Sequence, residues 1–201
     1  MQKDNSTLPL KVSLRRKLLR LIDNPVVLET HGGFGTVWAQ CYFDLSGGVV
    51  MEQDTTKAAA LAKQRPTWAV YECDSTFALS HGVGSHLPIN VFDLDPYGQC
   101  WLTLDAIMVG FSGKFPDVWA IVVNDGLRQK LMTSGSWSVQ SLREIVEKYG
   151  DRYAYRNYLS VCQELVATKS ASVGYTLAQW AGYYCGHDDN MTHFAAVLVR
   201  Q

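Results

Sequence analysis

Residues 89–98 have the sequence Ile-Asn-Val-Phe-Asp-Leu-Asp-Pro-Tyr-Gly, a mostly apolar run that ends in an acid, a proline and an aromatic residue. The part from Ile89 to Asp95 has the composition of a buried strand. In open α/β sheets, ligands bind beyond the carboxyl ends of the strands. If this strand belongs to such a sheet, Asp95, Pro96 and Tyr97 stand where a ligand binds.

The residues at the end of this predicted strand suit a planar substrate that carries an amino group. Asp95 offers a carboxylate acceptor. The ring of Pro96 fixes φ and contributes no N–H, so the rigid backbone presents only carbonyls. Tyr97 supplies a flat face, and Gly98 allows the backbone to turn sharply. An acceptor, a rigid carbonyl and an aromatic face together favour the recognition of an exocyclic amino group.

The Asp-Pro-Tyr-Gly string resembles motif IV of amino-directed methyltransferases that use S-adenosylmethionine, and most of all that of the tRNA guanine-N2 dimethyltransferases. The resemblance implies catalytic roles for Asp95, Pro96 and Tyr97. Side chains alternate along a strand, so Asp93 shares a face with Asp95 and is a candidate for substrate contact. A structural pair or cap is an equally good interpretation of Asp93. The other expected substrate contacts are Gly98 and, at the end of the next predicted strand, Asn124 and Asp125.

The rest of the chain alternates between strand and helix patterns, which predicts a parallel sheet with helices on both faces. Strands are expected at 26–29, 49–52, 68–73, 89–95, 118–124, 176–184 and 193–199. Helices are expected at 12–22, 36–44, 54–64, 75–81, 101–108, 142–149 and 156–168. Ser13 is expected to cap the first helix, and Asn24-Pro25 to end it. The last two strands, joined by a polar turn, form an antiparallel hairpin.

Five strand–helix units followed by a hairpin resemble the class I methyltransferase fold. This fold is an α/β, Rossmann-like architecture with a mostly parallel seven-stranded sheet and a C-terminal antiparallel hairpin. We expect an N-terminal helical segment over residues 1–24. A single S-adenosylmethionine-dependent methyltransferase domain is expected over residues 25–201.

A glycine-rich segment, Glu-Thr-His-Gly-Gly-Phe-Gly, follows the first predicted strand. Gly32, Gly33 and Gly35 permit a tight turn and the close approach of a cofactor, although a purely structural turn is the alternative. In the methyltransferases that the chain resembles, the acid that opens this motif helps to orient the amino-acid end of S-adenosylmethionine. The resemblance gives that role to Glu29. His31 stands where the family has its first glycine.

Acids end the next two predicted strands as well. Glu52 ends the second strand, beside Gln53, and can accept hydrogen bonds from ribose hydroxyls, as acids do in dinucleotide folds. Asp54 is better suited to cap the helix that follows. By resemblance, Asp74 at the end of the third strand accepts from the adenine amino group, with Ser75 nearby. The four strand-terminal acids then lie along one edge of one sheet, whereas any single acid is more simply a solvated loop carboxylate.

The composition is that of an ordinary globular domain, with 201 residues, 47% of them apolar, 18% charged, and a formal net charge of −1. No apolar run reaches about 18 residues and the N-terminus lacks the apolar core of a signal peptide, so we expect no membrane span and a cytoplasmic location. Five widely spaced cysteines without a Cys-x-x-Cys argue against a disulfide framework or a zinc site. His187, Asp188, Asp189 and His193 are more typical of a turn than of metal ligands, and no metal is expected.

These patterns predict an S-adenosylmethionine-dependent N-methyltransferase for an exocyclic amino group of a nucleic-acid base, with RNA favoured over DNA. The near-neutral charge limits nucleic-acid contacts to local patches. The candidate patches are Arg15, Arg16, Lys17 and Arg20, and the basic and aromatic stretch 152–158, although a solvated surface is the simpler interpretation of each. The alternatives are a small-molecule or protein methyltransferase, and a non-catalytic methyltransferase-like binding protein. No appended recognition domain like that of the tRNA enzymes is evident, and no oligomeric state is predicted.

Overall fold

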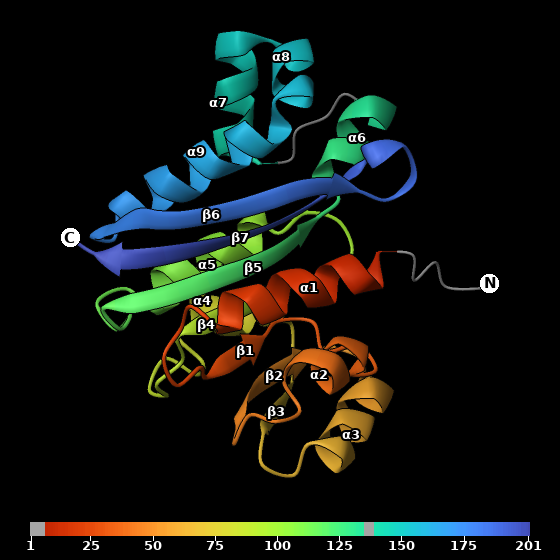
Figure 1. Cartoon of the computed structure of the whole chain (residues 1–201), viewed down its shortest axis with the longest axis vertical. Helices are drawn as coiled ribbons and strands as arrows, with labels where there is room; N and C mark the ends of the chain where they lie inside the picture. The colour runs from red at the N-terminus through yellow and green to blue at the C-terminus, as the bar shows by residue number, and fades with distance from the viewer. Residues whose placement is uncertain (1–6, 135–138) are drawn as a thin grey trace.

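The computed structural model describes residues 7–134 and 139–201, and its centre is a seven-stranded sheet with the order β3-β2-β1-β4-β5-β7-β6 (Figure 1). The strands are β1 (Val27–Glu29), β2 (Gly48–Glu52), β3 (Ala69–Glu72), β4 (Val91–Leu94), β5 (Val118–Asp125), β6 (Tyr175–Cys185) and β7 (Met191–Arg200). The first five strands are parallel, and β7 runs antiparallel to both of its neighbours. The prediction of a mostly parallel sheet with a C-terminal antiparallel hairpin is confirmed.

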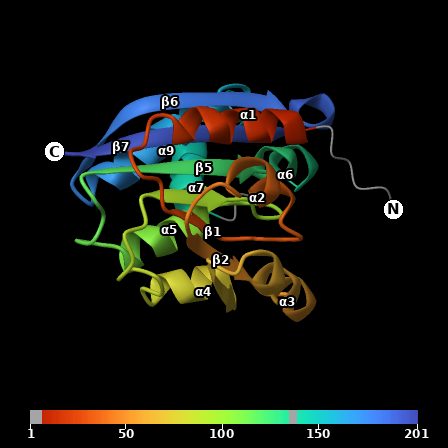
Figure 2. The same cartoon turned by 60° about the horizontal axis from the view of Figure 1, so that its bottom comes forward.

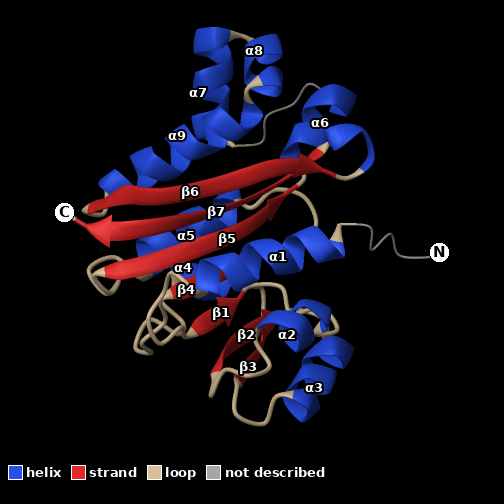
Figure 3. Ribbon diagram, in the orientation of Figure 1, coloured by secondary structure: helices blue, strands red, loops and turns tan. Residues whose placement is uncertain are grey.

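Helices cover both faces of this sheet (Figure 3). They are α1 (Leu8–Leu19), α2 (Thr36–Cys41), α3 (Thr55–Gln64), α4 (Ser75–Ser80), α5 (Trp101–Gly110), α6 (Leu127–Ser134), α7 (Gln140–Tyr149), α8 (Asp151–Arg156) and α9 (Tyr158–Ala171), with a 3-10 turn, η1 (His187–Asp189), before β7. One apolar layer takes side chains from α4, α5, α7 and α9, and the other takes them from α1, α2 and α3. Within the described ranges, no helix has the length and apolar character needed to cross a membrane.

The alternation of side chains along β4 decides which layer each residue reaches. Phe92 and Leu94 are buried in the layer that contains α4 and α5. Val91 is buried in the opposite layer, together with α1 and α3. Since successive side chains of a strand point to opposite faces, Asp93 lies on the α1 side of the sheet with Val91. Asp95, two residues further on, has the same orientation and also reaches α1.

The carboxyl ends of the parallel strands meet at one edge of the sheet. Glu29 is in register with Val50 of β2 and with Asp93 of β4, and Glu52 is in register with Glu72 of β3. Helix α1 packs against α2, β5 and β7, and Figure 2 shows it lying along the last two of these. The N-terminal half of α1 therefore reaches the edge where the acids lie.

Helix α1 differs from its predicted bounds at both ends. It begins at Leu8, with Pro9 in its first turn, where the missing N–H of proline has no helical partner to lose. Ser13 consequently lies inside the helix and is not its cap, which corrects the prediction. The helix ends at Leu19, before the predicted stop at Asn24-Pro25, and turns follow it.

The segment between β5 and β6 holds more helices than the sequence pattern predicts. Helix α6 was not predicted, because its short and mostly polar sequence has no clear apolar period. The helix expected at 156–168 is present as α9, two residues later at its start and three at its end, and the short helix α8 just before it was not predicted. Gly150 has φ +85° and separates α7 from α8, a conformation that favours glycine.

Candidate functional site

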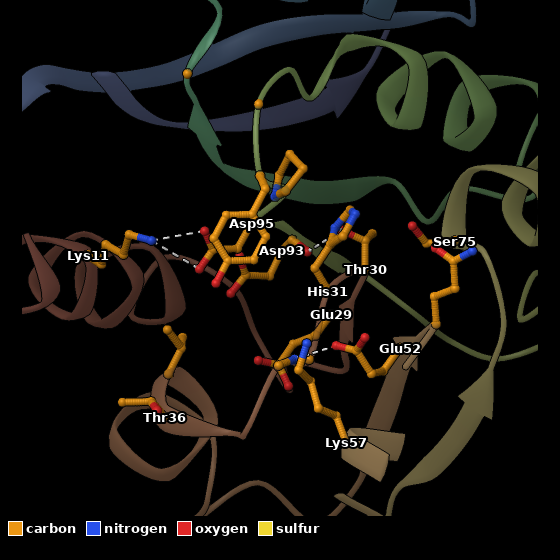
Figure 4. Close-up of a pocket in the computed structure, with 18 of the residues that line it drawn as sticks. Lys11, Glu29, Thr30, His31, Thr36, Glu52, Lys57, Ser75, Asp93 and Asp95 are labelled. Atoms are coloured by element: carbon orange, nitrogen blue, oxygen red, sulfur yellow. Dashed lines mark hydrogen bonds and ion pairs between the residues drawn. The ribbon is translucent and has the colours of Figure 1, made fainter. Parts of the chain in front are cut away.

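A cavity of about 710 Å³ opens at the carboxyl ends of β1 to β4 (Figure 4). Its volume lies in the range that is typical of small-molecule sites, about 300–1,000 Å³. The predicted site residues that line it are Glu29, His31, Gly32, Gly33, Glu52, Gln53, Asp74, Ser75, Asp93, Asp95, Pro96, Tyr97 and Gly98. The structure therefore brings the four strand-terminal acids to one cavity.

The glycine loop after β1 lies tightly against β2. The Gly32 N–H donates to the Met51 carbonyl at 3.1 Å, and the Gly33 N–H donates to the Glu52 carboxylate at 2.8 Å. A Cβ atom at Gly32 would lie 2.4 Å from a methyl of Val50, so any other residue there would force its neighbours to shift. Gly33 has φ +55° and open space beside it. The loop is thus held by β2 on one side and leaves its other side to the cavity.

The Glu52 carboxylate is fixed at the end of β2. One oxygen accepts from the Gly33 N–H at 2.8 Å and the other accepts from the Asp54 N–H at 3.0 Å. Asp54 caps α3, as predicted, by accepting from the Lys57 N–H. A carboxylate has about four acceptor positions, so Glu52 keeps capacity for hydroxyl donors in the cavity.

Asp74 caps α4 and lines the cavity at the same time. One of its carboxylate oxygens accepts from the Phe77 N–H at 2.8 Å. Ser75 follows it as a buried residue of the cavity lining. The cap commits one Asp74 oxygen and fixes the direction of the carboxylate, which leaves the second oxygen for a ligand donor.

Glu29 has a partner that the sequence did not predict. Its carboxylate forms a buried ion pair with the Arg65 guanidinium, which lies over the rings of Trp38 and Trp68 at 4.8 Å and 5.2 Å from their centroids. Burial raises the pKa of Glu29 to about 7, against the opposing effect of Arg65. In this structure Glu29 therefore anchors the start of the glycine loop from within the core.

His31 lines the cavity as an uncharged imidazole. Its Nδ1 lies 2.7 Å from the Thr30 hydroxyl. Burial lowers the pKa of His31, and the nearby carboxylates, Asp95 first among them, only partly oppose this effect. His31 thus adds a neutral polar group to the site at neutral pH.

Asp95 is held by two residues from different elements. The Lys11 ammonium of α1 donates to Oδ1 at 2.9 Å and to Oδ2 at 3.2 Å, and the Asn124 amide of β5 donates to Oδ1. Burial alone would raise the pKa of Asp95, but Arg15 and Lys11, with the hydrogen bonds from Lys11 and Asn124, lower it below its ordinary value. Asp95 is therefore an ionised acceptor over the whole neutral range.

Both carboxylate oxygens of Asp93 are held by structural partners. The Arg15 guanidinium donates to both of its oxygens, at 2.7 Å and 2.6 Å, and the Tyr42 hydroxyl donates to Oδ2 at 2.7 Å. Arg15 and Asp93 are almost completely buried. Of the two interpretations of Asp93, substrate contact and structural pairing, the structure supports structural pairing with Arg15.

Tyr97 stands at the mouth of the cavity with 97% of its surface exposed. The loop that carries it turns at Gly98, which has φ +117°. The Gly98 carbonyl accepts from the Gly126 N–H at 2.6 Å, so the loop is tied to the end of β5. The aromatic face of Tyr97 is presented to solvent beside Asp95.

Three predicted site residues do not line the cavity. Gly35 directly precedes α2 as its N-cap residue, with φ +77°. Asn124 is buried and acts on the site through Asp95. Asp125 is completely buried and accepts from the Leu127 N–H at 2.9 Å and from the Tyr158 hydroxyl at 2.6 Å. The prediction that Asp125 contacts the substrate is therefore wrong. Burial raises the pKa of this carboxyl to about 6, and its hydrogen bonds join the start of α6 to α9 inside the core.

The sequence interpretation missed the contribution of α1 to the site. Arg15 was a candidate for a substrate groove or a solvated face, but it is buried on Asp93. Lys11 was not considered, although it lines the cavity. The spacing of these residues in the sequence could have indicated their pairing with Asp95 and Asp93. Residues i and i+4 of a helix are about 6 Å apart, and residues i and i+2 of a strand are about 6.6 Å apart, so Lys11 and Arg15 match Asp95 and Asp93.

Comparison with known proteins gives structural relatives only. No protein-family model matches the chain, and no curated protein matches it in sequence. The structure of TYW2 from M. jannaschii in complex with AdoMet matches with a TM-score of 0.60 and 12% identity, over 100% of this chain and 79% of that chain. The complex of Trm1 from Pyrococcus horikoshii, a tRNA guanine-N2 dimethyltransferase, with S-adenosyl-L-methionine matches with a TM-score of 0.69 and 10% identity, over 100% of this chain and 56% of that chain.

A third structure is close to this chain in length. An rRNA methylase from Streptococcus thermophilus matches with a TM-score of 0.54 and 10% identity, over 100% of this chain and 98% of that chain. Together with the strand order, these likenesses define the fold. The chain has the class I methyltransferase fold, as its motifs predicted.

Proposed function

We propose that the protein is an S-adenosylmethionine-dependent N-methyltransferase that acts on an exocyclic amino group of a nucleic-acid base, with RNA favoured over DNA. The observation that carries the proposal is the position of Asp95, Pro96 and Tyr97, at the carboxyl end of β4 and on the lining of the cavity. Solved structures with this fold include AdoMet complexes and methyltransferases described as acting on RNA, which supports both the cofactor and the substrate class.

The residues of the cavity fit S-adenosylmethionine. Gly32 and Gly33 leave room for close approach to the loop, and Glu52 keeps acceptor capacity for the ribose hydroxyls. Asp74 and Ser75 lie one strand further on, where an adenine amino group would find an acceptor. When bound, the cofactor supplies an electrophilic methyl group: the acceptor nitrogen forms the new N–C bond as the C–S bond breaks, and the electron pair of that bond stays on sulfur.

Asp95 orients the amino group that is to be methylated. An exocyclic amine is a poor nucleophile while its lone pair is delocalised into the ring. A hydrogen bond from one amino hydrogen to the Asp95 carboxylate favours a more tetrahedral nitrogen and directs its lone pair into the cavity. After transfer the nitrogen must lose one proton, and Asp95 is placed to accept it and pass it to solvent. The lowered pKa of Asp95 ensures that the carboxylate is returned to its ionised form.

Two titrations and one product analysis test this function. Calorimetry with S-adenosylhomocysteine is expected to show binding to the wild type and nearly equal binding to Asp95→Ala. Incubation with labelled S-adenosylmethionine and bulk tRNA, rRNA or DNA, followed by nucleoside analysis, is expected to yield an N-methylated nucleoside from RNA. Turnover by Asp95→Ala should fall roughly a hundredfold. Failure of the wild type to bind S-adenosylhomocysteine would refute the cofactor assignment, and binding without nucleic-acid methylation would refute the acceptor class.

A further inference from the structure

The acceptor end of the cavity is the part beside Asp95, where the amino group to be methylated would bind. Two complementary pairs of charged residues build it. Lys11 and Arg15 lie one helical turn apart on α1, and Asp95 and Asp93 lie two residues apart on or just beyond β4. Helix and strand run in opposite directions here, so Lys11 meets Asp95 and Arg15 meets Asp93. The two spacings, about 6 Å and about 6.6 Å, allow both pairs to form at once.

The charges balance within these two pairs. Two cations of α1 oppose two carboxylates of β4. Of the histidines nearby, His31 lines the cavity and His193 of β7 is buried behind it, and burial lowers the pKa of both. Neither imidazole therefore carries charge at neutral pH.

The hydrogen bonds of Asp95 limit what it can offer a substrate. A carboxylate has about four acceptor positions. Lys11 takes one on each oxygen, and Asn124 takes another on Oδ1. What remains is suited to a single N–H of a neutral amino group. An ammonium group would need several acceptors and an unbalanced negative charge, and it would meet the Lys11 ammonium instead.

We propose that Lys11 is a positioning and specificity-determining residue, which holds Asp95 so that the site accepts uncharged amino groups of planar bases and rejects the ammonium groups of lysine side chains and polyamines. This inference rests on the proposed methyltransferase function and narrows its substrate class. It places α1 within the acceptor site, although its sequence gave no sign of catalytic motifs.

The first test measures Asp95 directly and needs no methyl transfer. The charged and polar groups that face Asp95 are Lys11 and Arg15 of α1, Asp93 of β4, Asn124 of β5, His193 of β7 and His31 of the glycine loop. The pKa of Asp95, measured by NMR titration of its carboxyl carbon, is expected to rise by about one pH unit or more in Lys11→Met. Lys11→Arg should titrate almost as the wild type does. Lys17→Met, which removes an exposed charge from the same helix, is the matched control and should leave the titration unchanged.

The second test measures acceptor choice, with bulk tRNA and poly-L-lysine as probes. The wild type is expected to methylate tRNA and not poly-L-lysine. Lys11→Met should lose roughly tenfold or more of its kcat on tRNA, since misplacing a reacting group by about 1 Å costs up to a hundredfold. The acid limb of its pH profile should move to higher pH, the poly-L-lysine to tRNA ratio should rise, and Lys11→Arg should restore most of the wild-type behaviour.

Calorimetry with S-adenosylhomocysteine separates this inference from the proposed function. Unchanged affinity in Lys11→Met would place the effect on the acceptor and not on the cofactor site. An unchanged Asp95 titration, or an unchanged ratio between the two probes, would overturn the role of Lys11. A wild type that binds S-adenosylhomocysteine and prefers poly-L-lysine would overturn both proposals. If it binds and methylates neither probe, the proposed acceptor is wrong, and the Asp95 titration alone decides whether Lys11 positions that carboxylate.

Discussion

The Arg15 guanidinium holds both carboxylate oxygens of Asp93, with Nε 2.7 Å from Oδ2 and Nη2 2.6 Å from Oδ1. The two residues come from α1 and β4, 78 positions apart in the chain, and both are buried. The Tyr42 hydroxyl completes the set by donating to Oδ2. The pair therefore joins the N-terminal helix to the strand that carries the Asp-Pro-Tyr motif. It also fixes the position of Lys11 relative to Asp95.

Breaking this pair should strongly destabilise the protein. Arg15→Met leaves the Asp93 carboxylate buried without its main partner, a change that typically costs about 3–5 kcal/mol. Chemical denaturation would measure the loss in the free energy of unfolding. The double variant Arg15→Met/Asp93→Leu should recover much of it, because no unpaired charge remains. Asp117→Asn, which breaks an exposed pair with Arg200, serves as the control and should change stability little.

Glu52 should contribute to cofactor affinity without being needed for folding. Removing a charged acceptor of ligand hydroxyls typically costs about 1.5–3 kcal/mol. We therefore expect Glu52→Ala to weaken S-adenosylhomocysteine binding roughly 10- to 150-fold in calorimetry. Glu72→Gln changes an acid at the same level of the neighbouring strand, outside the cavity lining, and should bind as the wild type does. Equal affinities in the two variants would contradict the assignment of Glu52.

Tyr97 should act on the acceptor substrate alone. Its side chain is 97% exposed, so Tyr97→Ala should leave the free energy of unfolding nearly unchanged. Stacking of a base on an aromatic side chain is worth about 1–3 kcal/mol, so KM for the RNA substrate should rise roughly 5- to 150-fold. Tyr97→Phe keeps the aromatic face and should behave almost as the wild type. A KM that is equally high in the Phe variant would mean that the hydroxyl, and not the ring, contacts the substrate.

His193 should make the protein sensitive to acid. Its side chain is buried on β7, and burial, with Lys11 and Arg15 nearby, lowers its pKa to about 3 from an ordinary value of 6.5. Below pH 6.5 the unfolded chain binds a proton that the folded chain does not, so this group removes stability as the pH falls from about 6.5 to about 3. Denaturation at several pH values should show a shallower loss in His193→Gln than in the wild type. His187→Gln, at an exposed histidine, should keep the wild-type slope.

The order of the elements was predictable because each parallel strand of this fold is a short apolar run that ends in a polar residue. Val91 to Asp95 is an example: the run is buried on both faces, and its charged end lies at the sheet edge. The bounds of α1 were less predictable, since Pro9 suits a first helical turn but also looks like a break. Helix α6, which follows the end of β5, lacks a clear apolar period, so the sequence pattern did not predict it.

The gathering of the strand-terminal acids at one cavity was predictable to the same degree, because these residues follow the ends of successive strands. The partners of the acids were not, since they depend on packing between distant segments. Nothing in the sequence near Glu29 indicates Arg65, and the matching spacings of Lys11 with Arg15 and of Asp95 with Asp93 become informative only once α1 is placed beside these acids. Asp125 follows the same strand-end pattern as Asp95, yet Tyr158 of α9 draws it into the core.

Gly32 should be the least replaceable residue of the glycine loop. A Cβ atom there would lie 2.4 Å from Val50 Cγ2 and 2.7 Å from Leu61 Cδ1, both in the buried layer beneath the loop. Overpacking of this kind costs about 1–3 kcal/mol, and relief of the clash would push the loop toward the cavity. Gly32→Ala is therefore expected to lower both the free energy of unfolding and the affinity for S-adenosylhomocysteine. Gly33→Ala is the matched comparison: its Cβ meets no atom within 4 Å, so only the backbone cost of φ +55° applies and the loss of stability should be smaller. Equal stability and affinity of Gly32→Ala and the wild type would show that the loop does not lie against β2 as described.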